Sequence, residues 1–291
     1  MDIMTADRTI FLQGAGIGRN RPGMLLVHGL GGTPVEMKTL GRRLQEAGIT
    51  VLCCQLAGHC GTAEDLTATG WRDWYASVEA GLNRLETVCD LVAVGGLSMG
   101  ALLAARLAWA QPQRVRGLVM LAPTLWYDGW AIPFYSFLLK LVIHLPFGER
   151  YAFVEREPYG VKDPRIRALV LRAMQSGDPN GAGLLSTPAV AIREMWRLTA
   201  ELRPLLPDIR QPALLVHARE DDTAGLSNAF HLQERLGGRV EALILEDSYH
   251  LVTVDRQRDL VARRTASFVA ALAAGPDAAL HLHQSGEGGN G

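Results

Sequence analysis

The sequence has few cysteines and almost no net charge, and each shortage excludes a class of protein. Four cysteines in 291 residues are too few for a disulfide framework, so we expect reduced thiols in the core. Twenty-nine basic residues balance 30 acidic ones, and the formal charge of −1 leaves no electrostatic footprint for nucleic acid. No spacing of His or Cys matches a metal-binding motif. We therefore expect no metal, no other cofactor and no nucleic-acid partner.

The sequence also lacks the long apolar stretch of a membrane-spanning helix. Its most apolar segment, Trp130 to Leu145, is interrupted by Lys140 and His144 and is shorter than the ~20 residues that a spanning helix needs. The first residues show no basic segment followed by an apolar one, the pattern of a secretory signal. We expect a cytoplasmic protein without a membrane span, and at most a transient contact with a membrane surface.

The apolar residues, 48% of the chain, fall into short runs that alternate with helical patterns. Such alternation is typical of a parallel sheet whose strands are joined by crossover helices. The expected strands cover residues 24–27, 50–55, 91–95, 118–121, 213–216 and 240–245, and the expected helices 34–47, 71–85, 101–110 and 255–273. For the first helix we predict Thr33 as the N-cap, Pro34 as the first helical residue and Glu36 as the partner of Thr33 in a capping box. The predicted fold class is α/β.

One interval is too long for a single crossover helix. Residues 125–203 separate two core strands, and seven of the chain's 19 aromatic residues lie between positions 126 and 147. We predict a core formed by residues 1–124 and 204–275, a helical cap formed by the insertion 125–203, and a disordered tail over the Gly-rich residues 276–291.

Residues 96–100 read GLSMG and match the G-x-S-x-G motif between an expected strand and an expected helix. A sharp strand-to-helix turn holds such a serine in strained backbone geometry, and glycines on each side let the neighbouring backbone pack closely. The Ser98 hydroxyl would project from the carboxyl end of the sheet, where open α/β sheets bind ligands. We predict that Ser98 is a nucleophile.

The chain resembles the α/β-hydrolase family over roughly residues 22–273, and bacterial carboxylesterases and monoacylglycerol-lipase-like enzymes in particular. The segments that carry the resemblance are LLVHGLGGTP (25–34), LAGHCGTAEDL (56–66), GGLSMGA (95–101), HARED (217–221) and DSYH (247–250). The second segment departs from the P-G-H-G-T pattern of these esterases, because Ala57 replaces the proline and Cys60 is inserted before Gly61. The resemblance implies a mostly parallel central sheet flanked by helices, with a helical cap insertion.

A serine nucleophile needs a base, and the base needs a carboxylate that holds its tautomer. The order Ser, acid, His of the family implies that His250 is the base, because it follows the last core strand in a short polar loop before the final helix. Three carboxylates follow strand 213–216. Alignment of the HARED segment with the family pattern implies Asp221 as the acid, and Asp222 is the alternative. We expect Glu220 and the unused aspartate to be solvated.

The tetrahedral intermediate of acyl transfer needs two N–H donors aimed at its oxyanion. One should be the backbone N–H of Met99, directly after the nucleophile. The family pattern H-G-x-x-G implies the backbone N–H of Leu30 as the other, with His28 bracing that loop.

The aromatic residues of the insertion are candidates for substrate binding. Trp126, Trp130, Phe134 and Phe137 would line an apolar cleft above Ser98 if the insertion caps the site. Alternatively, they form the cap's own core, a dimer contact or a face that lies on a membrane.

Taken together, these residues imply a serine carboxylester hydrolase that cleaves apolar acyl or monoacylglycerol-type esters through an acyl-enzyme intermediate. An acyl-thioesterase or acyltransferase could use the same triad, and a non-catalytic fold that binds a small apolar ligand is the remaining alternative. The expected partner is a small apolar ester, and the expected assembly is a monomer or a homodimer.

Overall fold

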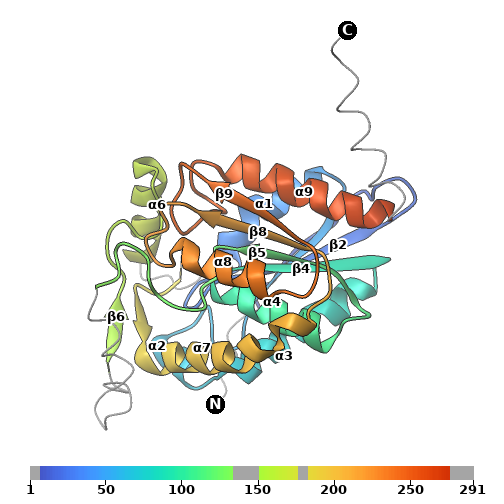
Figure 1. Ribbon diagram of the computed structural model, residues 1–291. Coiled ribbons are helices and arrows are strands. Elements are labelled where there is room, and N and C mark those ends of the chain that lie inside the picture. The colour runs from blue at the N-terminus through green and yellow to red at the C-terminus, as the bar shows by residue number, and fades with distance from the viewer. Residues whose placement is uncertain (1–6, 134–150, 176–182, 276–291) are drawn as a thin grey trace.

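A seven-stranded sheet forms the centre of the computed structural model, which describes residues 7–133, 151–175 and 183–275 (Figure 1). Its strand order is β1-β3-β2-β4-β5-β8-β9. β1 runs antiparallel to β3, and the other neighbouring pairs are parallel. The strands span Ile10–Leu12 (β1), Pro22–Val27 (β2), Thr50–Cys54 (β3), Leu91–Leu97 (β4), Val115–Leu121 (β5), Ala213–Ala218 (β8) and Val240–Leu245 (β9).

Helices cover both faces of this sheet (Figure 1). One face carries α1 (Val35–Glu46) and α9 (Arg258–Ala274), which pack against each other. The opposite face carries α3 (Trp71–Glu86), α4 (Met99–Ala110), α7 (Ala189–Leu202) and α8 (Leu226–Arg235), with the short α2 (Ala63–Thr67) and a 3₁₀ helix (Arg203–Asp208). The segment between β5 and β8 also contains α6 (Pro164–Gln175) and a two-stranded sheet of β6 (Ala152–Val154) and β7 (Ser186–Pro188).

The core strands are apolar on both sides because both faces of the sheet are covered. In β2, Leu25 and Val27 face the core cluster that contains α3 and α4. Met24 and Leu26 of the same strand face the cluster beneath α1 and α9. Adjacent residues of a strand point to opposite faces, so a strand buried on both faces reads as one continuous apolar run. That pattern is the one that predicted these strands.

The predicted α/β architecture is confirmed, with all six expected core strands and all four expected helices present and their ends shifted by at most a few residues. The structure adds β1, α2 and the β6–β7 sheet. Because β6 and β7 lie in the insertion, it is not purely helical, contrary to our expectation. Its last helix, α7, packs on α3 and α4, and Met195 and Leu198 belong to their core cluster. The predicted disordered tail lies outside the described residues.

The start of α1 differs from the predicted capping box. The helix begins at Val35 with Pro34 as its N-cap, and no side chain caps it. Glu36 turns toward the preceding loop instead, where its Oε2 accepts a hydrogen bond from the Gly29 N–H at 3.2 Å. The correction has a steric cause, because the glycines of that loop leave room for the carboxyl group.

The strand order places two loops side by side at the carboxyl edge of the sheet. β3 lies on one side of β2, whereas β4 and the later large-sheet strands lie on the other. At such a switch point the loops after the two neighbouring strands diverge and leave a crevice. Val27 of β2 pairs with Gly96 of β4, so the loop that begins at His28 and the turn at Ser98 are neighbours.

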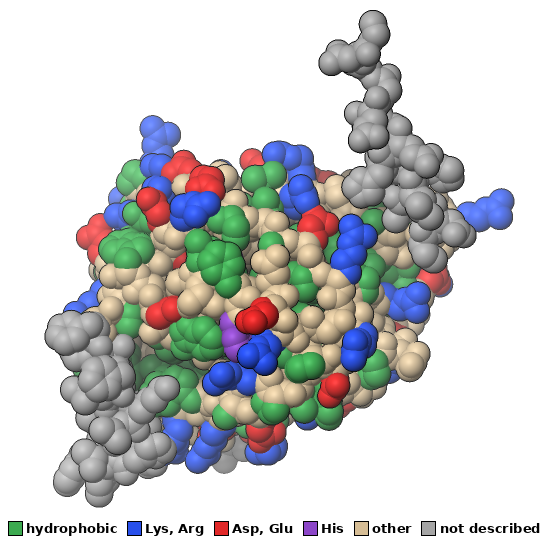
Figure 2. Space-filling view, viewed as in Figure 1, with side chains coloured by type: hydrophobic (Ala, Val, Ile, Leu, Met, Phe, Trp, Pro, Cys, Tyr) green, Lys and Arg blue, Asp and Glu red, His purple; other side chains and the backbone are tan. Residues whose placement is uncertain are grey.

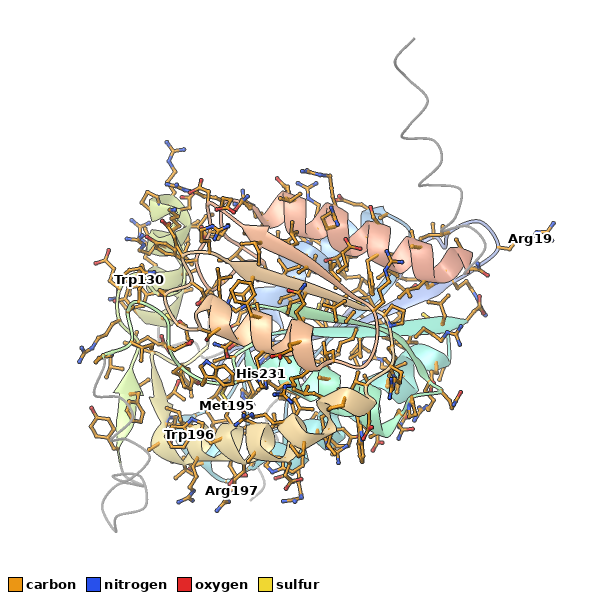
Figure 3. The ribbon with its side chains drawn as sticks, viewed as in Figure 1. Arg19, Trp130, Met195, Trp196, Arg197 and His231 are labelled. Carbon is orange, nitrogen blue, oxygen red and sulfur yellow. The ribbon has the colours of Figure 1, made fainter. Side chains whose placement is uncertain are left out.

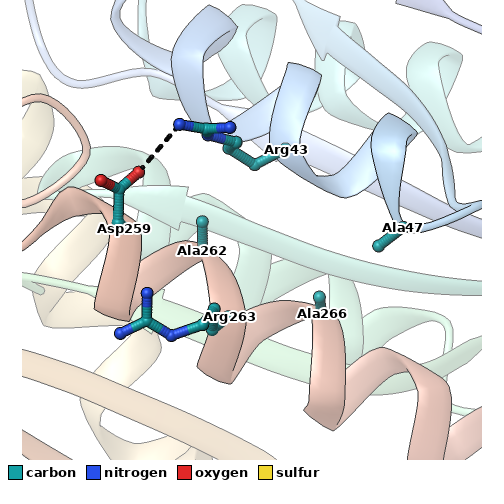
Figure 4. Close-up of a pocket in the computed structure, with 6 residues that line it drawn as sticks. All are labelled: Arg43, Ala47, Asp259, Ala262, Arg263 and Ala266. Carbon is teal, nitrogen blue, oxygen red and sulfur yellow. Dashed lines mark hydrogen bonds and ion pairs between the residues drawn. The ribbon is translucent and has the colours of Figure 1, made fainter.

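The surface carries basic and acidic side chains intermingled on the face that Figure 2 shows, in keeping with the near-zero net charge. A shallow groove lies between α1 and α9, where Arg43 and Asp259 form an ion pair at 3.3 Å (Figure 4). It contains none of the predicted site residues. Across the described ranges, no helix is long and apolar enough to cross a membrane.

Candidate active site

Ser98 stands at a strained turn between β4 and α4. Its backbone has φ 56° and ψ −119°, a left-handed conformation that is uncommon for a residue with a side chain. The glycines of the motif make this turn sterically possible. A Cβ atom on Gly96 would lie 2.3 Å from the carbonyl carbon of Gly100, and one on Gly100 would lie 2.3 Å from the carbonyl oxygen of Val27. The G-x-S-x-G spacing therefore reflects backbone packed against backbone.

The His250 ring is hydrogen-bonded to the carboxylate of Asp221. Its Nδ1 lies 2.9 Å from Oδ2 and 3.0 Å from Oδ1. Oδ1 also accepts the backbone N–H groups of Thr223 and Ala224, each at 2.8 Å. A carboxylate fixed by two backbone donors holds the imidazole with a proton on Nδ1, which leaves Nε2 free to accept one.

The charges around His250 favour its protonated form. Burial lowers the pKa of His250, but the carboxylates of Asp221, Asp222 and Glu155 outweigh burial and raise this pKa above its ordinary value of 6.5. Burial raises the pKa of Asp221 in turn, but the interactions with His250 outweigh it and hold that pKa below 3.8. The pair is thus suited to stabilise an imidazolium that forms during catalysis.

The Ser98 hydroxyl is hydrogen-bonded to Thr124 Oγ1 at 3.1 Å. Thr124 donates its own proton to the Ala122 carbonyl at 3.2 Å, so Ser98 is the donor in the pair. Within the described part of the chain, no hydrogen bond joins Ser98 to the His250 ring. Sequence reasoning missed Thr124. Its position three residues beyond the end of β5, at the same carboxyl edge, was the available signal.

The two predicted oxyanion donors lie on neighbouring segments, Leu30 in the loop after β2 and Met99 at the start of α4. Met99 is the first residue of α4, where the helix dipole favours a negative charge. Leu30 follows Gly29, and a Cβ atom on Gly29 would lie 3.7 Å from Ser98 Cβ. Neither the Leu30 nor the Met99 N–H takes part in the hydrogen bonds found among the described residues. Both donors are thus available to an oxyanion.

His28 braces the Leu30 loop as a neutral ring. Burial, together with the nearby His59, lowers the pKa of His28 to about 3. Its Nδ1 donates to the Gly29 carbonyl at 2.9 Å, and its Nε2 accepts from the Leu56 N–H at 3.3 Å. The two bonds together require one tautomer, with the proton on Nδ1.

The two carboxylates on either side of Asp221, Glu220 and Asp222, differ in burial. Glu220 is exposed, as expected, and pairs with Lys162. Asp222 is buried, contrary to our expectation. Its Oδ2 accepts the Gly160 N–H at 3.0 Å, and its Oδ1 accepts the His250 N–H at 3.2 Å. Asp222 is buried because it satisfies two backbone donors, one in the insertion and one in the His250 loop.

The tryptophans proposed for substrate binding make polar contacts on the protein surface. The Trp126 indole donates to Asp128 at 3.0 Å and Ser227 at 2.8 Å, with its ring against His231 of α8. Trp130 is 59% exposed at the side of the molecule that carries α6 and β6 (Figure 3). Phe134 and Phe137 lie outside the described residues. An apolar cluster does include Leu30 of the loop at residues 28–33, and it comprises Leu30, Tyr127, Phe153, Ala189, Ile192 and Trp196.

Groups of His, Cys, Asp or Glu that could hold a metal ion are absent from the described ranges. His250 and Asp221 form a hydrogen-bonded pair at the carboxyl edge of the sheet, the edge at which Ser98 also lies. Serine hydrolases of the α/β-hydrolase fold are the class that this fold and site define.

A model of one protein family, described as "Serine aminopeptidase, S33", matches residues 18–257, and the chain belongs to this family. A thermostable monoacylglycerol lipase from Bacillus sp. (strain H-257) is 28% identical over 249 residues, which cover 85% of this chain and 90% of that protein. A carboxylesterase from Bacillus subtilis (strain 168) is 25% identical over 251 residues, covering 86% and 92%. Among solved structures, one from a study of LipS and LipT, two metagenome-derived lipolytic enzymes, has a TM-score of 0.74 at 26% identity and covers 93% of this chain and 99% of its own.

Proposed function

We propose that the protein hydrolyses carboxylic esters through an acyl-enzyme, with Ser98 as nucleophile, His250 as base and Asp221 as the acid that holds His250. The observation that carries the proposal is the 2.9 Å bond from His250 Nδ1 to Asp221, at the same sheet edge as a serine in a strained turn. Similarity to a monoacylglycerol lipase and a carboxylesterase supports the same reaction.

The steps follow from these roles. After rotating away from Thr124, Ser98 Oγ attacks the ester carbonyl carbon while His250 Nε2 takes its proton. The Leu30 and Met99 N–H groups hold the oxyanion. The C–O bond to the alcohol then breaks, and His250 returns the proton to the leaving oxygen. Water, activated by His250, attacks the acyl-enzyme and releases the acid and free Ser98.

The surroundings of the site favour an ester of an apolar acid with a small polar alcohol. The apolar cluster around Leu30 provides a surface on which an acyl chain would be bound by burial. The charge of Glu155 acts on both His250 and Asp222, so a carboxyl group lies near the same site. It would accept hydrogen bonds from free hydroxyl groups of the alcohol. A monoacylglycerol combines both features, and one relative is named for that substrate.

The insertion 125–203 is proposed to act as a cap on this site. The Leu184 N–H donates to the Gly31 carbonyl at 2.9 Å, which ties the insertion to the oxyanion loop. The Gly160 carbonyl accepts the Leu251 N–H at 2.8 Å, which ties it to the loop of the base. Both sides of the proposed site are thus in contact with the insertion.

A substrate panel tests the reaction and the substrate class together. It comprises p-nitrophenyl esters of graded chain length, and monoacylglycerols, methyl esters and acyl-CoA thioesters that share one acyl chain. We expect kcat/KM to be highest for the monoacylglycerol of the matched set. A thioester cleaved faster than every matched oxygen ester would favour the acyl-thioesterase alternative, and transfer to an added alcohol in preference to water would favour an acyltransferase.

Covalent labelling tests the nucleophile separately. A fluorophosphonate should label the wild type at Ser98, and Ser98→Ala should abolish labelling and leave only residual hydrolysis supported by the oxyanion donors. Ser227→Ala, which removes an exposed hydroxyl on α8, is the matched control and should label normally. Labelling of the Ser98→Ala variant would move the nucleophile elsewhere and end this proposal.

A further inference from the structure

The Leu30 N–H belongs to the peptide group between Gly29 and Leu30. Two side chains, His28 and Glu36, hold the Gly29 backbone in place. The Gly29 carbonyl belongs to this peptide and accepts His28 Nδ1–H at 2.9 Å. The Gly29 N–H, across the same Cα, donates to Glu36 Oε2 at 3.2 Å. A peptide group is planar, so fixing the Gly29 carbonyl and its Cα fixes the direction of the Leu30 N–H.

The carboxyl group of Glu36 occupies the space that glycines leave open beneath this loop. A Cβ atom on Gly32 would lie 2.1 Å from Glu36 Oε1 and 2.5 Å from Oε2. On Gly29, a Cβ atom would lie 3.7 Å from Oε2 and 3.7 Å from Ser98 Cβ. The carboxyl group therefore packs directly against the loop that approaches Ser98, and a side chain at position 32 would displace it.

We propose that Glu36 is a positioning residue for catalysis, whose carboxyl group holds the Gly29 N–H and so points the Leu30 N–H at the oxyanion. The inference rests on the proposed ester hydrolysis. Glu36 lies in the first turn of α1, where its position in the sequence suggests only a helix-capping role. The inference gives it a role in catalysis.

The titratable groups that face Glu36 come from three other segments. The charges of His250 after β9 and Glu155 after β6 act on Glu36, and the Glu36 carboxylate raises the pKa of the Cys60 thiol after β3. Burial raises the pKa of Glu36 to about 7. Near neutral pH the side chain thus exchanges between a carboxylate, which is the stronger acceptor, and a neutral acid. Because the interaction with His250 is mutual, the Glu36 carboxylate also favours the protonated imidazole.

Substitutions at Glu36 separate its hydrogen bond from its volume and its charge. Glu36→Met fills a similar volume without an acceptor, whereas Glu36→Gln keeps an oxygen for the Gly29 N–H and removes the charge. Glu46→Ala, an exposed carboxylate on the same helix, is the matched control. Loss of a whole oxyanion donor costs ~10²–10³ in kcat, so misdirecting one should cost about 10–100-fold.

The readouts are the rate of Ser98 phosphonylation by a fluorophosphonate and kcat and KM on p-nitrophenyl butyrate. We expect Glu36→Met to slow phosphonylation and kcat by about 10–100-fold with little change in KM, and Glu36→Gln to remain within about fivefold of the wild type. Glu36→Gln should also shift the acid limb of kcat/KM to lower pH, because His250 loses a facing negative charge. That shift reports the charge of Glu36, whereas a fall in kcat of the folded Glu36→Met variant at unchanged KM reports the hydrogen bond, and a merely structural role would not produce that fall.

Four results would overturn the inference. If the wild type is phosphonylated at Ser98 and Glu36→Met reacts at the same rate, the role of Glu36 is overturned and the proposed function stands. Glu36→Gln as slow as Glu36→Met, with thermal melts showing both variants folded, overturns the role of the hydrogen bond. If Glu36→Met fails to fold, Glu36→Leu, which also lacks an acceptor, takes its place under the same criteria, and a folded Glu36→Gln more than about fivefold slower than the wild type overturns the inference. A wild type that is not phosphonylated at Ser98 overturns the proposed function and this inference together.

Discussion

At the scale of single residues, the neighbours Asp221 and Asp222 bind different parts of the same histidine. Asp221 contacts the His250 ring, and Asp222 contacts the His250 backbone N–H and the Gly160 N–H of the insertion. The first interaction bears on the tautomer and charge of the proposed base. The second bears on the position of its backbone. In the proposed mechanism, chemistry and placement thus fall to separate carboxylates.

Substituting each aspartate by asparagine should separate these two effects. Asp221→Asn should lower kcat by ~10⁴-fold with folding retained, because the ring can then adopt the wrong tautomer. Asp222→Asn should lower kcat less than about tenfold, or ~1.4 kcal/mol of barrier. It should also lower the melting temperature, because one of its two backbone N–H groups then faces an amide NH₂. Kinetics and thermal melts of both variants measure this.

The reverse pattern would contradict the assignment. If Asp222→Asn is the crippled variant and keeps its melting temperature, Asp222 is the acid. If neither substitution affects kcat, the carboxylate comes from another strand.

The candidate residues that sequence could predict are those with a local signal. Ser98 lies in a five-residue motif, and His250 and Asp221 follow from chain order within a family. Thr124 has no such signal, because it matters through a contact across the fold, where β5 ends beside β4. Glu36 lies close in sequence to the glycines that leave room for its carboxyl group, but the sequence suggested a capping box and did not show that the side chain turns to Gly29.

At the scale of elements, the start of α4 sets helix propensity against packing. Gly100 lies in the first turn of α4, where replacing glycine by alanine would ordinarily favour a helix by about 1 kcal/mol. A Cβ atom there would lie 2.3 Å from the Val27 carbonyl oxygen and 2.5 Å from that of His28. These are backbone atoms of the neighbouring strand and loop, and they cannot move without displacing the site.

Gly100→Ala should therefore destabilise the protein by about 1–3 kcal/mol, as overpacking does. Gly41→Ala is the matched control in α1. Its Cβ atom would meet only the ends of side chains, the nearest being Cys53 Sγ at 3.3 Å, so its effect should stay within about 1 kcal/mol. Urea unfolding of both variants measures the difference. A Gly100→Ala variant as stable as the wild type would show that the turn relaxes.

The elements that sequence predicted are those whose pattern is long enough to read. The core strands other than the edge strand β9 are largely buried on both faces, and the main helices span three or more turns, so their apolar pattern is clear. β1, β6 and β7 each have three residues, and α2 has five. Segments this short form because a neighbour is already in place, as when Phe11 of β1 pairs with Leu52 of β3. Local sequence carries little of that information.

At the scale of the whole molecule, two buried histidines link folding to pH. The rings of His28 and His59 lie 5.0 Å apart, and burial lowers their pKa values to about 3 and about 4. The unfolded chain binds a proton on each ring below about pH 6.5, whereas the folded protein does not until those lower values. Stability therefore falls as the pH drops below about 6.5. Glu36 acts in the opposite sense, because its raised pKa lets the folded protein bind a proton first.

His59→Gln should reduce this acid sensitivity. Glutamine keeps an N–H donor for the Ala57 carbonyl, which His59 Nδ1 contacts at 3.0 Å, but cannot be protonated. Between about pH 6.5 and 4.5, the slope of the unfolding free energy against pH should fall by about 1.4 kcal/mol per unit relative to the wild type. Urea titrations across that range measure it. His231→Gln is the comparison variant, because burial also lowers the pKa of this partly exposed ring but by less, so its slope should fall by less than that of His59→Gln. Equal slopes for the wild type and His59→Gln would contradict the linkage.

The bond from Leu184 to the Gly31 carbonyl limits how freely the insertion can be exchanged. A chimera that takes its cap from another family member would have to reproduce the backbone here. A Cβ atom at Gly183, whose φ is +85°, would lie 2.4 Å from the Gly31 oxygen. A graft with any larger residue at that position would push on the loop that carries the proposed oxyanion donor. The insertion and the loop at Gly31 are therefore a single unit for recombination, and new specificity should be easier to obtain by changing side chains within the insertion than by replacing it whole.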